Sequence, residues 1–258
     1  MDAAKIAELF APWRKQHARR AWKPVLGTNA NARSHFGGDP ILADGEQWPM
    51  CGACGAAMLL FVQLDVATLP EGHPVRGSGL LQLFCCADGI DCETWSAFSK
   101  GHLVRLQASS GSRVACPAID PQLTQSFPCR SIDAWEPVVD MPNPQEHEAL
   151  GIAYERDFNA KTVVATCAAI NVAVGPLSQD LGIQYAIGES TSFDKLGGWP
   201  SWIQGVEYPS CKICQQRMEL VLQLDSEDSI PHMFGDMGRG HITQCLAHPE
   251  VLAFAWAC

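Results

Sequence analysis

The chain has 258 residues, of which 47% are hydrophobic and 18% charged, a balance typical of a globular protein with a substantial core. Its formal net charge of −10 disfavours nucleic-acid binding, because phosphates need cationic partners. The charge is uneven, with +4 over residues 1–24 and −14 over the remainder. We interpret the basic stretch as a solvated helix face; docking onto the acidic body or onto another molecule is the alternative.

The sequence shows no signal for a membrane or for secretion. It contains no run of eighteen apolar residues, and its N-terminus lacks the charged-then-apolar layout of a signal peptide. We therefore expect a cytoplasmic protein without membrane contact. The twelve cysteines are then predicted to be thiols or metal thiolates, because a reducing compartment disfavours disulfides, which are the alternative.

The first predicted element is an amphipathic helix over residues 2–21, with an apolar stripe of Ile6, Leu9, Phe10 and Trp13. Pro12 is expected to kink or restart this helix. Residues 37–49 are rich in glycine, proline and aspartate, which predicts an ordered loop. Strands are expected after this loop at Met58–Asp65, Leu80–Cys86, His102–Gln107 and Ala134–Val139.

The second half of the chain opens with turn-forming residues. Residues 142–150 predict a linker between two lobes, and a helix is expected to begin within residues 143–158. Residues 163–174 form a short apolar stretch. Further strands are predicted at Met218–Asp225, Gly240–Cys245 and Val251–Ala257. Because strands joined by loops outnumber strand-helix-strand crossovers, the sequence predicts an α+β fold with mostly antiparallel sheet.

Two stretches that lie 160 residues apart carry one pattern without a gap. The first reads GGDPILADGEQWPMCGACGAAMLLFVQLD from Gly37, and the second reads GGWPSWIQGVEYPSCKICQQRMELVLQLD from Gly197. Ten identities at one constant offset predict an internal duplication. They are Gly37, Gly38, Pro40, Pro49, Cys51, Cys54, Met58, Gln63, Leu64 and Asp65, with counterparts at Gly197, Gly198, Pro200, Pro209, Cys211, Cys214, Met218, Gln223, Leu224 and Asp225.

Each stretch carries a Cys-x-x-Cys before an apolar run, as in small metal-stapled β units. In the first stretch, one tight turn can present two sulfurs, and an antiparallel partner strand would return the end of Leu80–Cys86 beside them. Alternation along that strand sends Cys85 and Cys86 to opposite faces, so only one of the two is expected to coordinate. The predicted ligands are Cys51, Cys54, Cys86 and Cys92. Four thiolates close the coordination shell, which predicts a structural metal.

The second stretch offers Cys211, Cys214 and Cys245 by the same argument. His248 follows Cys245 by three residues and precedes a proline, so it suits a second turn and is the preferred fourth ligand. Cys258 is the alternative. If the last strand folds back as a hairpin, Cys258 lies about 20 Å from Cys245 at about 3.3 Å per residue, which is too far for one ion. We therefore predict two structural Zn²⁺ ions.

Metal-free interpretations of the paired cysteines are two core thiols or a redox pair. A redox pair normally lies at a helix N-terminus after a strand, whereas here each motif closely follows a proline and precedes a strand. Three further cysteines stand apart and are interpreted as core or surface thiols: Cys116, Cys129 and Cys167.

These residues resemble the DUF1963 family, the proteins similar to bacterial YwqG. The family pattern of Gly-Gly-x-Pro, Trp-Pro or an equivalent, and Gln-Leu-Asp matches Gly37–Asp65 and Gly197–Asp225, and Phe234-Gly-Asp-x-Gly with the later His-Pro-Glu and Phe-x-Trp looks like its C-terminal signature. More distantly, the paired Cys-x-x-Cys motifs look similar to programmed-cell-death-2 proteins, which are dedicated chaperones of a ribosomal protein. The resemblance implies architecture more than function, because DUF1963 has no established activity, although some members sit beside toxin genes. Many members lack the cysteines, so the resemblance implies no family-wide catalytic metal.

Other candidate sites have simpler structural interpretations. The glycines of FGDMGRGH loosely resemble a phosphate-binding loop, but a turn is preferred because no helix is expected after them. Asp65 and Asp225 end matched strands and are predicted to cap turns; lining a shared cleft is the alternative. Five scattered histidines are interpreted as structural residues: His73, His102, His147, His232 and His241.

Acidic and aromatic residues gather in the sequence around the second Cys-x-x-Cys. The acidic group is interpreted as a solvated loop, with a cation or a basic client as the alternative; its members are Asp225, Glu227, Asp228 and Asp236. The aromatic residues Trp199, Trp202 and Tyr208 are core residues if buried, and would hold a basic peptide if exposed.

Together these features predict an internally duplicated α+β protein with two pseudo-symmetric, mostly antiparallel β lobes and peripheral helices. The expected parts are an N-terminal helix and arm over residues 1–29, a first lobe over residues 30–142 and a second over residues 143–258. The predicted function is non-enzymatic: a zinc-stapled module that holds a segment of a basic protein partner in an acidic groove between the lobes. The alternatives are an immunity protein that neutralises a neighbouring toxin and an enzyme that uses the interlobe cleft.

Overall fold

The computed structural model describes residues 2–87, 91–117, 127–167, 170–176 and 180–258, with side chains described outside residues 167–181. Contacts divide the chain into two compact units. Their bounds differ from the boundaries expected at residues 29 and 142, and the division into two repeat lobes stays a prediction. Unit 1 comprises Met1–Ala21, Val138–Ser192 and Gly198–Val206, and unit 2 comprises Trp22–Pro137, Phe193–Gly197 and Glu207–Cys258.

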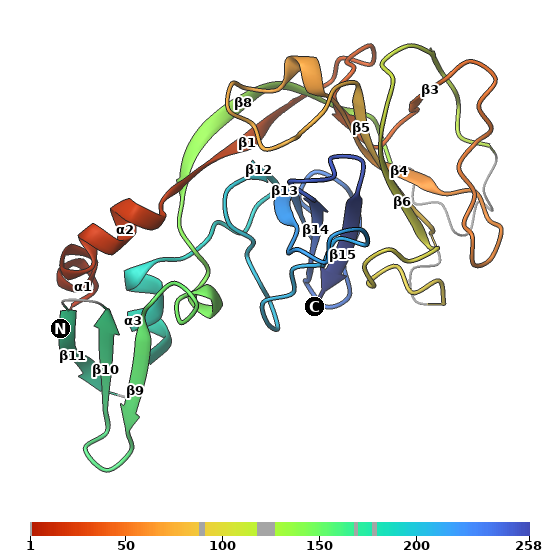
Figure 1. Cartoon of the computed structure of the whole chain (residues 1–258). Helices are drawn as coiled ribbons and strands as arrows, with labels where there is room; N and C mark the ends of the chain where they lie inside the picture. Colours follow the sequence, from red (N-terminus) through yellow and green to blue (C-terminus); the bar gives the residue numbers. More distant parts are fainter. Residues whose placement is uncertain (1, 88–90, 118–126, 168–169, 177–179) are drawn as a thin grey trace. The chain divides into compact units, whose positions relative to one another are not determined.

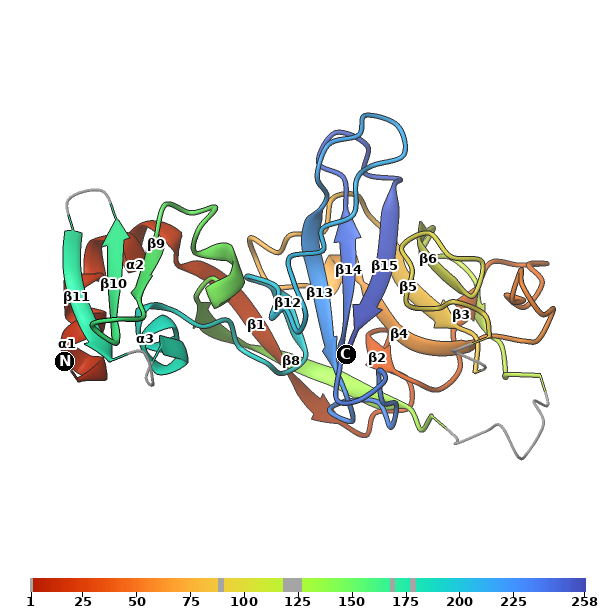
Figure 2. The same ribbon diagram turned by 90° about the horizontal axis from the view of Figure 1, so that it is seen from below.

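Unit 1 combines helices with an antiparallel sheet of order β11-β10-β9. Helix α1 contacts α3, and α3 contacts β11 (Figures 1 and 2). Its apolar core includes Ile6, Phe10, Trp13, Ile152, Val163, Ile183 and Ile187. The elements are α1 (Ala3–Leu9), α2 (Ala11–His17), the 3-10 helix η2 (Pro144–Glu146), β9 (Ala153–Asp157), β10 (Thr162–Cys167), β11 (Ile170–Pro176) and α3 (Asp180–Ile187).

The predicted N-terminal helix is two short helices that meet at Phe10. The side chain of Asp2 caps α1 by accepting a hydrogen bond from the backbone N–H of Lys5 at 2.9 Å. Pro12 stands in the first turn of α2, where its missing N–H costs no helical hydrogen bond, so the helix restarts there. Burial of Phe10 and Trp13 confirms the predicted apolar stripe, and Pro12 explains the break.

Residues 143–158 differ from the sequence prediction, because they form η2 and β9 and no α-helix. The side chain of Asn143 caps η2, and both Glu146 and His147 are buried. The predicted linker is therefore an ordered part of unit 1. Strand β9 forms because it pairs along its length with β10, a contact that charge alternation within the segment does not reveal.

Asp140 is a buried carboxylate that organises the loops of unit 1. It accepts hydrogen bonds from the backbone N–H of Thr191 at 2.8 Å and from that of Trp199 at 2.8 Å. The hydroxyl of Thr191 adds a third at 3.1 Å. Gly198 has a φ of +78°, and a Cβ at this residue would lie 2.3 Å from Asp140 Oδ2. Glycine is therefore required at position 198 for both conformation and space.

Replacing Gly198 by alanine is expected to lower the free energy of unfolding by about 3 kcal/mol, because the new methyl displaces a buried, hydrogen-bonded carboxylate. Gly151 of the same unit is the matched control: its φ is +87°, and a Cβ there meets nothing within 4 Å. Gly151→Ala should cost only the left-handed backbone strain, about 1 kcal/mol. Urea unfolding of both variants measures the difference, and equal effects would contradict the role given to Asp140.

A ten-stranded sheet of order β15-β14-β13-β12-β1-β8-β2-β4-β5-β6 dominates unit 2, where β3 and β7 form a separate pair. Its strands are β1 (Arg19–Gly27), β2 (His35–Phe36), β4 (Leu59–Asp65), β5 (Leu80–Cys85), β6 (His102–Gln107), β8 (Arg130–Asp140), β12 (Lys195–Gly197), β13 (Glu219–Asp225), β14 (Arg239–Gln244) and β15 (Leu252–Ala257). The remaining elements are β3 (Ile41–Leu42), β7 (Ser112–Arg113) and the 3-10 helix η1 (Val66–Thr68).

Two antiparallel meanders, β4-β5-β6 and β13-β14-β15, occupy the two ends of the sheet order. Each has a register shift near the start of its first strand, between Leu60 and Val62 in one and between Leu220 and Leu222 in the other. The outer strands β6 and β15 contact each other (Figures 1 and 2). The two ends of the sheet order therefore lie close together in unit 2.

One apolar core serves both meanders of unit 2. All seven strands predicted from sequence are present, although Ala134–Val139 is only the middle of the longer β8. Strand β1 was not predicted, and its first residues, 19–21, were expected to end the N-terminal helix; pairing within the sheet makes them a strand instead. The structure is thus β-rich, mostly antiparallel, with few helices. Core members include Phe61, Leu64, Leu83, Cys85, Leu222, Leu224, Phe234 and Phe254.

Within the described residues, no helix has both the length and the apolar character needed to cross a lipid bilayer.

Candidate metal centres

The first centre is built where β5 returns beside a tight turn. In that turn the backbone N–H of Cys51 donates to the carbonyl of Ala56 at 2.7 Å, and an isolated bridge joins Met50 to Ala57. The sulfurs of Cys54 and Cys86 are 3.6 Å apart. All four predicted ligand sulfurs lie within 4.8 Å of one another: Cys51, Cys54, Cys86 and Cys92. This group can hold a metal ion.

The second centre has the same construction at the ends of β13 and β14. The backbone N–H of Cys211 donates to the carbonyl of Gln216 at 2.9 Å, and the sulfurs of Cys214 and Cys245 are 3.6 Å apart. His248 contributes Nδ1, which is 3.7 Å from the sulfurs of Cys211 and Cys245. These four ligand atoms also lie within 4.8 Å of one another, so this group can hold a metal ion too.

Both sets of distances suit a tetrahedral shell. Ligands at about 2.3 Å for sulfur and about 2.0 Å for nitrogen place neighbouring ligand atoms about 3.6–3.8 Å apart in a tetrahedron. The observed separations are 3.6 Å between sulfurs and 3.7 Å between sulfur and Nδ1. A disulfide would need about 2.05 Å between sulfurs. The spacing therefore fits ligands around an ion better than oxidised pairs.

Backbone hydrogen bonds prepare one sulfur of each centre for ionisation. Burial opposes ionisation of Cys51, but hydrogen bonds from the backbone N–H groups of Cys54 and Ala53, together with those of the Cys54 and Cys92 side chains, lower the pKa of Cys51 to about 7. Cys211 follows the same pattern, and its pKa falls to about 6. Burial raises the pKa of Cys92, and neighbouring thiols of the group raise it further. Four adjacent thiols cannot all ionise without a cation, which is the charge that a divalent metal supplies.

The remaining cysteines lie outside these two groups among the described residues. Cys85 lies in the apolar core of unit 2, away from the metal group that contains Cys86, as alternation along β5 predicts. Burial raises the pKa of the Cys85 thiol. Cys258 follows β15, and a Cβ on Gly235 would lie 2.4 Å from its sulfur. In the sheet Ala257 pairs with Arg239, the first residue of β14, whereas Cys245 follows the last residue of β14. Cys258 and Cys245 therefore lie at different ends of this strand. Cys116 and Cys129 are half-buried free thiols, and the side chain of Cys167 lies outside the described residues.

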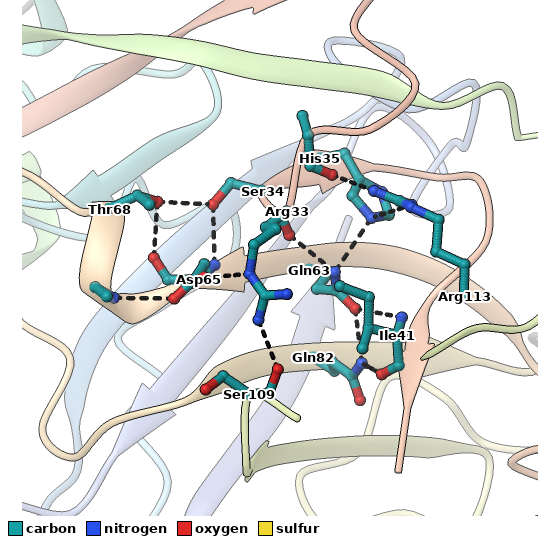
Figure 3. A network of polar contacts seen from close by, with 12 residues as sticks. Arg33, Ser34, His35, Ile41, Gln63, Asp65, Thr68, Gln82, Ser109 and Arg113 are labelled. Carbon is teal, nitrogen blue, oxygen red and sulfur yellow. Dashed lines mark hydrogen bonds and ion pairs between the residues drawn. The ribbon is translucent and has the colours of Figure 1, made fainter. Parts of the chain in front are cut away.

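A buried polar network lies beside the first Gly-Gly motif (Figure 3). Gln63 of β4 donates to the carbonyl of Arg33 at 2.8 Å, and its carbonyl oxygen accepts from the backbone N–H of Ile41 at 2.8 Å. Gln82 of β5 donates to the same Gln63 oxygen at 2.8 Å. His35 Nδ1 lies 2.7 Å from the carbonyl oxygen of Gly37, and burial lowers the pKa of His35 to about 4. The network fixes the loop that precedes the first centre and leaves its buried groups satisfied.

Asp65 and Asp225 act as the sequence predicts, at turns after matched strands. Asp65 accepts from the backbone N–H of Ala67 at 3.1 Å, which caps η1, and from Arg33 Nε at 2.6 Å (Figure 3). Asp225 accepts from the backbone N–H of Ser226 at 3.0 Å and pairs with Arg239 at 3.1 Å. Turn capping is confirmed for both residues.

The scattered histidines are structural in character. Burial lowers the pKa of each of them, to about 4 for His102, His147 and His232, to about 3 for His241, and to a lesser extent for His73. They are therefore neutral near pH 7. His102 packs its ring against Phe254 at 5.4 Å, and His147 Nδ1 is 2.6 Å from the hydroxyl of Tyr154.

The aromatic residues near the second motif are less exposed than peptide binding would require. Trp199 and Trp202 have relative exposures of 3% and 6%, so they are core residues and cannot grip a partner. The indole N–H of Trp202 donates to the buried Glu146 carboxylate at 2.8 Å. Tyr208 stacks under the guanidinium of Arg217 at 4.3 Å.

The acidic group is divided between structural and exposed members. Asp225 is half-buried and pairs with Arg239, whereas Glu227, Asp228 and Asp236 are exposed on the loop between β13 and β14. Asp228 also accepts from the backbone N–H of Asp194 at 2.8 Å. Asp194 was missed in the sequence, although its burial, followed by repulsion from Asp228, raises its pKa to about 7. The sequence marks Asp194 only by its position, three residues before the second Gly-Gly motif.

Comparison with protein families identifies the family to which this chain belongs. A family model described as "Domain of unknown function (DUF1963)" matches residues 34–244, which is most of the chain. The chain belongs to the DUF1963 family. A stretch of 38 residues is also 47% identical to the uncharacterized protein YpfL of Salmonella typhimurium. That match covers 15% of this DUF1963 chain and 9% of YpfL, and the resemblances to YwqG and to programmed-cell-death-2 proteins stay predictions.

Proposed function

We propose that both centres hold structural zinc. The observation that carries this proposal is that four protein ligands converge at each centre, so no coordination position is left for a substrate or a reactive water. Thiolate-rich, tetrahedral groups select zinc over hard cations, which prefer oxygen. The proposed ligands are those of the two groups, Cys51, Cys54, Cys86 and Cys92 in one and Cys211, Cys214, Cys245 and His248 in the other.

We also propose that the two meanders of unit 2 are copies of one ancestral element. Support comes from contacts that recur at the offset of 160 residues. Gln63 donates to the carbonyl of Arg33, and Gln223 donates to the carbonyl of Phe193. The isolated bridges Met50–Ala57 and Ser210–Arg217 show the same offset. Both Cys-x-x-Cys turns thus enter their meanders in the same way.

The proposed role of the stapled unit is to bind a basic protein segment without catalysing a reaction. Unit 2 contains 19 acidic and 11 basic residues, a net charge of −8. Its described surface exposes twelve carboxylates against five basic side chains. Two closed zinc centres are non-reactive, so they support a scaffold better than an active site. Surface charge of one sign steers and selects cationic partners. Since Trp199 and Trp202 are buried, charge carries more of this role than the sequence predicts.

Binding of synthetic peptides tests this role. A 15-residue Lys/Arg-rich peptide is expected to bind in fluorescence anisotropy, to weaken steeply as salt rises, and to bind far better than a peptide with glutamate in place of the basic residues. The double variant Glu227→Gln, Asp236→Asn should weaken binding about tenfold, since it removes two exposed charges. Glu148→Gln, Glu155→Gln in unit 1 removes the same charge and is the matched control. Equal weakening in both variants would indicate nonspecific attraction and overturn the proposed role of unit 2.

A further inference from the structure

One ten-residue segment of unit 2, residues 92–101, connects the two candidate metal centres. Both of its ends lie at the first centre. Cys92 is a member of that group, and the carbonyl of Gly101 accepts from the backbone N–H of Cys86 at 2.8 Å. The carbonyl of Lys100 accepts from the backbone N–H of Gly52 at 2.9 Å, beside the Cys51 sulfur at 3.7 Å. The position of the segment therefore depends on the geometry of the first centre.

The middle of the segment packs on the second centre. Ala97 and Phe98 lie against the buried cluster that contains Cys211 and Cys245. The ammonium of Lys212, inside the second Cys-x-x-Cys, stands 4.1 Å above the ring of Phe98. The chain thus returns from the first centre to cover the second.

A further set of contacts joins the segment to β15, the strand that follows His248. Trp256 donates its indole N–H to the hydroxyl of Thr94 at 3.1 Å and its backbone N–H to the carbonyl of Trp95 at 3.2 Å. The rings of Trp95 and Trp256 meet edge-on at 6.3 Å. Both the ligand turn and the last strand of the second centre therefore contact residues 92–101.

The backbone of the segment is held in an unfavourable conformation. Glu93 has a φ of 51° and Phe98 has a φ of 62°, in the left-handed region that side chains other than glycine rarely adopt. Such residues cost of order 1 kcal/mol each and persist only where surrounding contacts hold them. Loss of the hold at Cys92 would let the segment relax and withdraw Phe98 from the second centre.

We infer that the two centres bind metal cooperatively, with residues 92–101 as the coupling element. This inference rests on the proposed structural zinc sites. Metal at the first centre fixes both ends of the segment, which presses Phe98 onto the second centre and preorders its ligands. By linkage, metal at the second centre must favour the first by the same factor, which for ordinary coupling is about tenfold.

A four-protein comparison tests the coupling, with zinc affinity measured by competition against a chromophoric chelator. Cys54→Ser removes an exposed ligand of the first centre, and it is expected to weaken zinc binding at the intact second centre about tenfold. In the Phe98→Ala background the same Cys54→Ser change should leave the second centre unaffected, because the connection is already lost. Phe158→Ala, at a side chain 75% exposed in unit 1, is the matched control and should preserve the effect.

Each outcome separates this inference from the zinc proposal. Two zinc ions per wild-type chain, with an unchanged second centre in folded Cys54→Ser protein, would overturn the coupling alone. Fewer than two ions in the wild-type chain would overturn the two-site proposal itself. If Cys54→Ser fails to fold, Phe98→Ala decides instead, since it retains all eight ligands: two separate steps of zinc release in this variant against one in the wild type support coupling, and identical release overturns it.

Discussion

Removal of zinc is expected to abolish the cooperative unfolding transition of unit 2. Structural zinc contributes about 10–16 kcal/mol of apparent binding free energy in small zinc-binding peptides. This is comparable with the total stability of an ordinary domain, about 5–15 kcal/mol. Both centres lie in unit 2. Their ligands stand at the starts of the two meanders and in the turns that follow β5 and β14, so metal loss frees four chain segments around one core at once.

Circular dichroism during heating, with and without a strong zinc chelator, measures this effect. Chelator already saturated with zinc is the control for nonspecific destabilisation. The metal-free chain is expected to lose its sharp transition, and readdition of zinc to restore it. An unchanged melting curve in protein shown by elemental analysis to contain no zinc would contradict a structural role for the metal.

Neighbouring cysteines at the end of β5 are expected to differ sharply when each is replaced by alanine. Cys86→Ala should reduce the zinc content from two ions per chain to one and lower the free energy of unfolding by more than about 4 kcal/mol, because it opens a metal shell. Cys85→Ala removes only a small buried thiol from the apolar core, so it should keep both ions and cost about 1 kcal/mol.

The pair is a matched control, since both side chains are 2% exposed and adjacent in the chain. Zinc is counted by elemental analysis and stability by urea unfolding. Similar losses in the two variants would show that burial, and not coordination, governs this end of the strand. Retention of two ions in Cys86→Ala would remove Cys86 from the proposed ligands.

The sequence by itself predicted the two groups that the structure brings together, because the information needed is local. A Cys-x-x-Cys turn, an apolar strand and an antiparallel return fix where the next ligands lie to within one residue. Strand alternation allowed only one of Cys85 and Cys86 to be a ligand, and strand length favoured His248 over Cys258 as the fourth ligand of the second centre. Turn capping by Asp65 and the helix restart at Pro12 were predictable for the same reason.

Tertiary structure alone decided the features that depend on contacts between distant segments. Strand β1 forms through pairing with β8 and β12, which lie far along the chain, and strand β9 forms through its hairpin with β10; neither has a strong local preference for a strand. Burial of Trp199 and Trp202, which weakens the predicted aromatic grip, follows from packing that composition does not encode. Apart from the predicted ligand Cys92, residues 92–101 carry no motif, and only the folded chain shows that they contact both centres. Local patterns specify which residues can share an ion, whereas long-range packing specifies which elements surround and connect them.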